Sequence, residues 1–91
     1  MAVKVKLPTQ LRAAAGGEGE VFLEGDTVGA VLDALYATHG ELRERIADDD
    51  GTLRRFVNVY VNGDDIRFGD GLQTPVPAGA ELQILPAVAG G

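Results

Sequence analysis

The sequence has no cysteine, one histidine and few basic residues. Without a thiol, a disulfide scaffold, a thiolate metal site and a cysteine nucleophile are all excluded. The single histidine, His39, does not support a Ser-His-Asp triad. Its place beside a predicted helix end favours a solvated residue that complements the helix dipole over a general base. Eight basic against fourteen acidic residues give a net charge of -6, which argues against nucleic acid or an anionic membrane as a partner.

Long apolar runs are also missing from the sequence. No run approaches the ~20 residues that a membrane span needs. The N-terminal segment MAVKVKLPTQ alternates charged and apolar residues and lacks the apolar core of a signal peptide. We therefore expect a cytoplasmic protein. With 91 residues, 45% of them hydrophobic, the chain has the composition of one globular domain.

The first quarter of the chain predicts two strands. Residues Ala2–Leu7 alternate between an apolar face and a face that carries Lys4 and Lys6, and a proline stops the pattern. The segment Thr9–Gly19 is rich in alanine and glycine and is interpreted as a connection, because its glycines lack the following Gly-Lys-Ser/Thr of a phosphate loop. Glu20–Glu24 is a second short strand, and its closeness in sequence predicts an antiparallel pair.

The period then changes to that of a helix. Apolar residues at i, i+3, i+4, i+7 and i+8 predict an amphipathic helix over Thr27–His39, capped by Asp26 or Thr27. Gly40 stands where a left-handed helix stop is expected. The residues that follow Gly40, ELRERI at Glu41–Ile46, are consistent with a short second helix.

The most strand-like segment is Leu53–Asn62, with three valines on one face and aromatic and amide side chains on the other. Asn62-Gly63 predicts a tight hairpin, because both residues tolerate the positive φ of a type I′ turn. We expect the return strand at Ile66–Phe68.

The last part of the chain predicts an irregular segment and one more strand. Two prolines within Gly69–Gly79 argue against regular structure there, and Glu81–Leu85 reads as a strand that Pro86 ends. The predicted fold is α+β, a mixed sheet of four or five strands with one main helix across one face. The residues expected to form its core are Val3, Val5, Val28, Val31, Leu32, Leu35, Val57, Val59, Leu82 and Ile84.

The sequence ends on LPAVAGG. A terminal Gly-Gly adds nothing to a core, since glycine has no side chain and loses the most backbone entropy on ordering. Two interpretations follow. The tail is a frayed terminus, or the carboxylate of Gly91 is the functional group and the glycines let it enter a narrow slot.

Four stretches, GDTVGAVLDAL, RRFVNVYVNGDDIRF, PAGAELQILP and the final AVAGG, together with the order of elements, resemble the β-grasp family of ubiquitin and of the ThiS and MoaD types of sulfur carrier. The resemblance covers essentially the whole chain. The tail is most similar to that of the sulfur carriers of cysteine biosynthesis. The resemblance implies a ubiquitin-like β-grasp domain over residues 1–85 and a flexible functional tail over residues 86–91.

The resemblance also implies a chemistry for the tail. In such carriers a partner adenylating enzyme of the ubiquitin-activating type uses ATP to convert the carboxylate, here that of Gly91, into an acyl adenylate. Sulfur then displaces AMP and leaves a thiocarboxylate. The chain itself is then a carrier and not an enzyme, with no bound cofactor and no metal. The residues that would thread the partner's active site are Ala87, Val88, Ala89 and Gly90.

Several recipients of the sulfur are compatible with this resemblance. The tail implies a pyridoxal-phosphate (PLP)-dependent cysteine synthase, followed by a zinc metallopeptidase that trims the added cysteine. A molybdopterin, thiamine or secondary-metabolite pathway is an alternative. A ubiquitin-like modifier that joins Gly91 to a lysine shares the adenylation step, so the sequence separates it poorly from a carrier. The free protein is expected to be a monomer.

Other candidate sites are less persuasive. The run Asp48–Asp50 lacks the alternating ligand spacing of a calcium loop and is interpreted as a solvated loop. Phe56 and Tyr60 fall on the strand face opposite the valines, where they either form a small cluster or make an exposed patch that docks partner enzymes, joined by Phe68.

Overall fold

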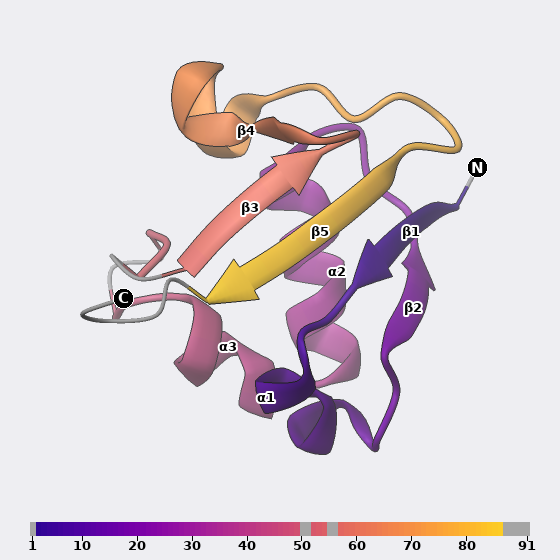
Figure 1. Cartoon of the computed structure of the whole chain (residues 1–91), viewed down its shortest axis with the longest axis vertical. Coiled ribbons are helices and arrows are strands. Elements are labelled where there is room, and N and C mark those ends of the chain that lie inside the picture. Colours follow the sequence, from indigo (N-terminus) through magenta and orange to yellow (C-terminus); the bar gives the residue numbers. More distant parts are fainter. Residues whose placement is uncertain (1, 50–51, 55–56, 87–91) are drawn as a thin grey trace.

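The computed structural model describes residues 2–49, 52–54 and 57–86. Its strands and helices follow one another along the chain as shown in Figure 1. In chain order they are β1 (Val3–Lys6), α1 (Thr9–Arg12), the 3₁₀ helix η1 (Ala13–Ala15), β2 (Glu20–Leu23), α2 (Val28–Thr38), α3 (Glu41–Ile46), β3 (Val57–Val61), β4 (Asp64–Asp65), the 3₁₀ helices η2 (Ile66–Phe68) and η3 (Gly71–Gln73), and β5 (Glu81–Pro86).

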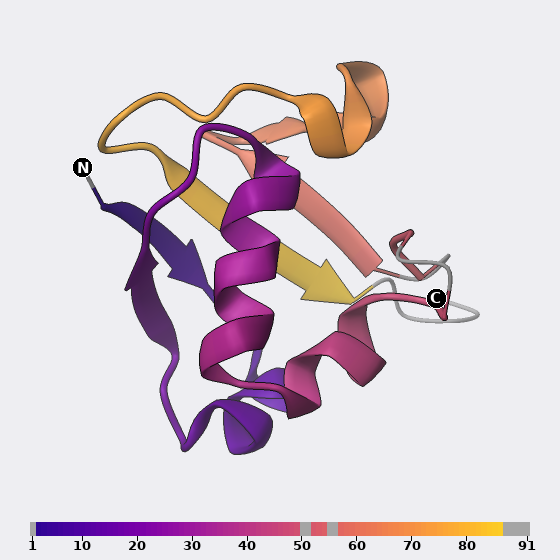
Figure 2. The same cartoon turned by 180° about the vertical axis from the view of Figure 1, so that it is seen from behind.

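The strands form one mixed sheet in the order β2-β1-β5-β3-β4. The first and last strands, β1 and β5, are parallel, and each other neighbouring pair is antiparallel. The helix α2 crosses one face of the sheet, and α1 and α3 lie near the end at which β5 finishes (Figure 2). The opposite face of the sheet is the one turned toward the viewer in Figure 1. The predicted fold class, a mixed sheet with one main helix across it, is confirmed.

The core lies between α2 and the sheet. Alternation along β1 and β3 gives the burial that the sequence predicts, with valines inward and polar or aromatic side chains outward. On α2 the buried side chains recur at helical spacing, so that one stripe faces the sheet. All ten predicted core residues are buried, Val3, Val5, Val28, Val31, Leu32, Leu35, Val57, Val59, Leu82 and Ile84.

The helix α2 begins as predicted and ends differently. The Thr27 hydroxyl accepts a hydrogen bond from the N–H of Ala30 at 3.2 Å, so Thr27 is the N-cap. The prediction of a left-handed stop at Gly40 is wrong, because this residue has φ -56 and ψ -31 and leads directly into α3. His39, with φ -131, makes the break between the helices instead.

The segment predicted as a plain connection, Thr9–Gly19, contains α1 and η1. Two of its apolar side chains, Leu11 and Ala15, are buried in the core cluster, which gives these short turns something to pack against. Gly16, in a left-handed conformation with φ 69, ends η1. Two single turns are too short to show a helical period in the sequence, so the prediction of a connection missed them.

For the hairpin after β3, the predicted turn is confirmed and the predicted return strand is wrong. Asn62 and Gly63 have φ values of 49 and 90, the positive values that a type I′ turn requires. The return strand covers only Asp64–Asp65, while Ile66–Phe68 forms η2. The carboxylate of Asp65 accepts the N–H of Arg67 at 2.8 Å, which bends the backbone out of the ladder.

Two further boundaries differ from the prediction. The strand β3 starts at Val57, and Leu53 makes only an isolated antiparallel bridge to Ala47. The turn-rich segment Gly69–Gly79 includes η3, whose Leu72 packs against the core cluster.

Replacing Leu32 with alanine tests the packing of α2 on the sheet. The side chain of Leu32 is 2% exposed, so Leu32→Ala removes buried apolar surface and leaves a cavity. We expect it to lower the free energy of unfolding by about 2–5 kcal/mol, measured by urea denaturation. The neighbouring Asp33 is exposed, and Asp33→Ala serves as the control. Similar values for the two variants would show that α2 is not packed as described.

The pH dependence of stability tests the environment of Tyr36. Burial, reinforced by the Asp33 carboxylate and opposed by Arg43, raises the pKa of the Tyr36 phenol to about 12. The fold thus favours the neutral phenol, whose pKa in the unfolded chain is about 10. This contribution to stability is complete below pH ~10 and is lost as the pH rises toward ~12. We expect Tyr36→Phe to flatten the decline in unfolding free energy across this range, and identical declines would contradict the assignment.

Candidate functional site

The structure describes the base of the tail, up to Pro86. The residues predicted to carry and deliver the reactive carboxylate lie outside the described residues, and these are Ala87, Val88, Ala89, Gly90 and Gly91. The strand β5 runs through Pro86, one residue further than predicted, and Pro86 pairs with Val57 at the start of β3. The fold therefore contributes to the site by fixing Pro86, the last described residue and the first of the predicted tail.

That position is fixed because β5 is the middle strand. Lys4, Val5 and Lys6 of β1 pair with Glu81, Leu82 and Gln83 on one side of β5, and β3 pairs along the other side from Leu82 to Pro86. Leu82 and Ile84 are fully buried beneath α2. A slip of one residue would turn both side chains to the outer face, so burial holds the register.

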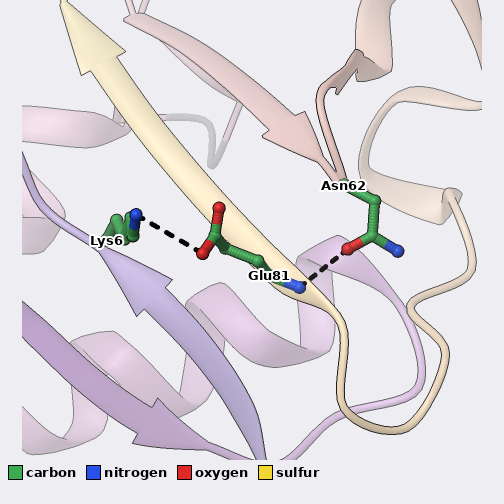
Figure 3. Close-up of polar contacts among 3 residues, drawn as sticks. All are labelled: Lys6, Asn62 and Glu81. Carbon is green, nitrogen blue, oxygen red and sulfur yellow. Dashed lines mark hydrogen bonds and ion pairs between the residues drawn. The ribbon is translucent and has the colours of Figure 1, made fainter.

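The first residue of β5, Glu81, is held on both sides (Figure 3). Its N–H donates to the Asn62 side-chain oxygen at 3.0 Å, and its carbonyl accepts the N–H of Asn62 at 2.9 Å. Its carboxylate pairs with the ammonium of Lys6 at 3.5 Å. The ion pair is partly exposed and contributes little by itself. Together the contacts tie the hairpin, β5 and β1 at the end of the sheet opposite Pro86.

The outer face of the sheet carries the residues that suit docking. Tyr60 of β3 is half-buried there, opposite Gln83 of β5 and Asp65 of β4. Phe68 in η2 is 92% exposed. Phe56, the third member of the predicted patch, lies outside the described residues. The docking patch stays a prediction.

The sequence reasoning missed one aromatic on this surface. Phe22 is 63% exposed and pairs with Lys4 across the β2–β1 ladder. The sequence contained a signal for this residue, because alternation along Glu20–Glu24 puts the side chain of Phe22 on the same face as Glu20 and Glu24. Leu85 of β5, 37% exposed, adds apolar surface next to the tail base.

Metal ligation and membrane insertion are two further possibilities that the geometry addresses. Over residues 2–49, 52–54 and 57–86, no three histidine, aspartate or glutamate side chains come together as metal ligands. In the same ranges, none of the helices is long and apolar enough to span a bilayer.

A five-stranded mixed sheet with a helix across one face and its last strand in the middle defines a ubiquitin-like β-grasp protein. The comparisons with known proteins agree. The ThiS family model matches residues 5–91, and the chain belongs to this family.

Its relatives include sulfur carriers and a modifier. The sulfur carrier protein CysO of Mycobacterium tuberculosis is 48% identical over 93 residues, which cover 100% of both chains. The structure of the BexX/CysO complex of Amycolatopsis orientalis aligns with a TM-score of 0.91 and 46% identity, covering 99% of this chain and 100% of the other. SAMP1 of Haloferax volcanii aligns with a TM-score of 0.85 and 36% identity over 100% of each chain.

The contact between Asn62 and Glu81 gives a matched pair of variants. Asn62→Gly keeps the positive φ but loses the side-chain bond to Glu81, and we expect a loss of about 0.5–1.5 kcal/mol in unfolding free energy. Asn62→Ala loses the same bond and also strains the left-handed backbone, which adds about 1–2 kcal/mol. Amide hydrogen exchange at Glu81 should be faster in both. An unchanged exchange rate would show that this bond does not hold the start of β5.

Proposed function

We propose that the chain carries sulfur as a thiocarboxylate on Gly91 and delivers it to an enzyme of cysteine biosynthesis. As a ThiS-family member with full-length CysO relatives, the chain is a sulfur carrier and not a catalyst. The observation that supports the proposal most strongly is the central strand β5, which ends at Pro86 and leads into AVAGG.

The chemistry requires an activating partner. A carboxylate is a poor electrophile, so sulfur attacks it only after the oxygen has been converted into a better leaving group. We propose that an adenylating enzyme uses ATP to form the acyl adenylate of Gly91 with release of pyrophosphate. Attack by hydrosulfide on the acyl carbon then expels AMP and gives the thiocarboxylate directly. A persulfide sulfur also expels AMP, but it leaves an acyl disulfide whose S–S bond a second thiol must reduce to release the thiocarboxylate. The product is a protein-bound nucleophilic sulfur that cannot diffuse away.

The length of the tail suits delivery into a buried site. Residues 86–91 reach ~20 Å when extended at ~3.3 Å per residue. The folded body thus stays outside while the terminal carboxylate enters a partner's active site. Gly90 and Gly91 permit close backbone approach at the reacting carbon.

Partners fall into two groups in this proposal. The first is the adenylating or sulfur-transfer enzyme, and the crystallised complex of a related CysO with BexX supports the existence of such protein partners. The second is the acceptor, for which we propose a PLP-dependent cysteine synthase followed by a trimming zinc metallopeptidase, as the resemblance to the carriers of cysteine biosynthesis implies, with molybdopterin, thiamine or secondary-metabolite enzymes as the alternative. Both would dock on the outer face around Tyr60, with Phe56 and Phe68 as further contacts.

A second candidate function is protein modification through the same carboxylate. The likeness to SAMP1, a small archaeal modifier, favours it, because a modifier also needs adenylation of the terminal glycine. The two functions differ in the product, since a carrier gains sulfur and a modifier gains a protein joined through a lysine.

Removing the terminal glycine tests the proposal. Deleting Gly91 should change the free energy of unfolding by less than about 0.5 kcal/mol, since it contributes no side chain. The same deletion should abolish sulfur gain, measured as intact mass after incubation with the cognate adenylating enzyme, ATP and sulfide. Gly90→Val should lose most of the sulfur gain because a β-branched residue restricts the backbone, and Gly90→Ala is the smaller control. If the shortened chain still gains sulfur at its new end, the tail is an ordinary terminus and the proposal is wrong.

A further inference from the structure

A cavity lies beside the base of the tail. It has a volume of about 880 Å³ and is open to solvent between the end of β1, the turn that carries α1, and the last residues of β5. Gln83, Ile84 and Leu85 line it, and they directly precede Pro86. A group that fills this cavity therefore lies next to the point where the tail leaves the body.

One arginine in this cavity is held in a fixed position by the backbone around it. The Nε–H of Arg12 donates to the carbonyl of Leu7 at 3.1 Å. Gly19 also lies close to this side chain, and an added Cβ there would stand 3.0 Å from Nε and 3.1 Å from the guanidinium carbon. The planar group thus lies against a glycine backbone that leaves just enough room for it.

The terminal amino groups of Arg12 are available for a partner. A guanidinium has five N–H donors. The hydrogen bond to Leu7 uses the one on Nε, and over residues 2–49, 52–54 and 57–86 the rest of the guanidinium makes no hydrogen bond or ion pair. Lys6, which lines the same cavity, is already paired with Glu81.

We propose that Arg12 is an interface anchor that binds a side-chain carboxylate of the adenylating enzyme that receives the tail. The proposal rests on the proposed function, because the tail must enter a partner for this cavity to meet one. A guanidinium presents two parallel N–H groups to a carboxylate, a paired geometry that adds strength and direction. Arginine is also enriched among the few residues that dominate interfaces.

The remaining charges of the cavity define the partner surface further. Glu18 and Glu20 also line it, and neither is paired with Arg12. An incoming carboxylate needs a basic neighbour to offset these two glutamates. The partner segment that fits therefore carries an acidic side chain for Arg12 next to a lysine or arginine for Glu18 and Glu20.

The contact should set affinity and leave the chemical step alone. Arg12 belongs to the folded part of the chain and contributes no reacting atom, so we expect it to bind ground state and transition state equally. Loss of such uniform binding raises KM and leaves kcat unchanged. The effect should also shrink as ionic strength rises, because salt screens exposed charges.

Kinetics of tail activation with four variants test the inference. The probe is the adenylating enzyme from the same genome, assayed for AMP formation with ATP and sulfide at low and high salt. We expect Arg12→Ala to raise KM at least tenfold with kcat unchanged. Arg12→Lys keeps the charge but loses the paired geometry and should raise KM severalfold. Gly19→Ala displaces the guanidinium without changing any charge and should act in the same direction. Arg43→Ala removes an exposed charge outside the cavity and is the control.

The outcomes separate the two proposals. If the wild-type chain is never activated, the proposed function is wrong and the role of Arg12 falls with it. If the wild-type chain is activated and the three cavity variants keep its KM, or differ no more than Arg43→Ala does, only the interface role of Arg12 is wrong. A fall in the melting temperature with an unchanged KM would show that Arg12 merely fastens α1 to Leu7, and this also overturns the inference.

Discussion

The pairing of β5 on both sides is the interaction on which the placement of the tail depends. The last strand of the chain lies between β1 and β3, so both of its edges are hydrogen-bonded. Its inward side chains, Leu82 and Ile84, are fully buried under α2. Pairing with β1 ends at Gln83, and pairing with β3 continues to Pro86. Opening of β5 at its start would break both ladders and expose the core, and the β3 ladder then carries the strand on to the base of the tail.

In the proposed function, the folded part of the chain binds the partners and the C-terminal tail carries the reactive group. The folded part of the chain provides the outer face of the sheet and a cavity beside β5, whose lining combines surface residues such as Arg12 with the edge of the core at Ile84. Exposed aromatics such as Phe22 and Phe68 cost little stability there and offer contact area to a partner. The tail needs no side-chain chemistry of its own, since ATP and a partner enzyme supply the activation in the proposed function. In that proposal the chain supplies the carboxylate and the binding surface, and a partner enzyme supplies the catalysis.

Elements with a repeating pattern or a backbone requirement could be predicted from the sequence, including the short helix α3, whose bounds Glu41–Ile46 are as predicted. The single turns α1 and η1 could not. The α2 helix, the valines of β3 and the turn at Asn62 each follow from a pattern that extends over several residues or from a backbone requirement. The turns α1 and η1 hold only two buried side chains, Leu11 and Ala15, which is too few to show a period. The end of α2 depends on how α3 packs, so glycine preference alone placed the stop wrongly at Gly40.

The part of the candidate site that could be predicted is the C-terminal segment itself. The Gly-Gly terminus and the strand before it identified the family and the reactive group that the family implies. The fixed guanidinium of Arg12 was not predictable, because it depends on Leu7 and Gly19 meeting it across a turn. Phe22 differs from Arg12, because alternation along Glu20–Glu24 is enough to predict that its side chain lies on the exposed face of β2.

The most direct measurement of the central claim is fragmentation mass spectrometry of the intact protein isolated from its own cells under mild conditions. If the chain is a sulfur carrier, we expect the mass to show one oxygen replaced by sulfur, with the change confined to fragments that contain Gly91. Sulfur located on any other residue, or Gly91 found only in amide linkage to a lysine of another protein, would contradict it.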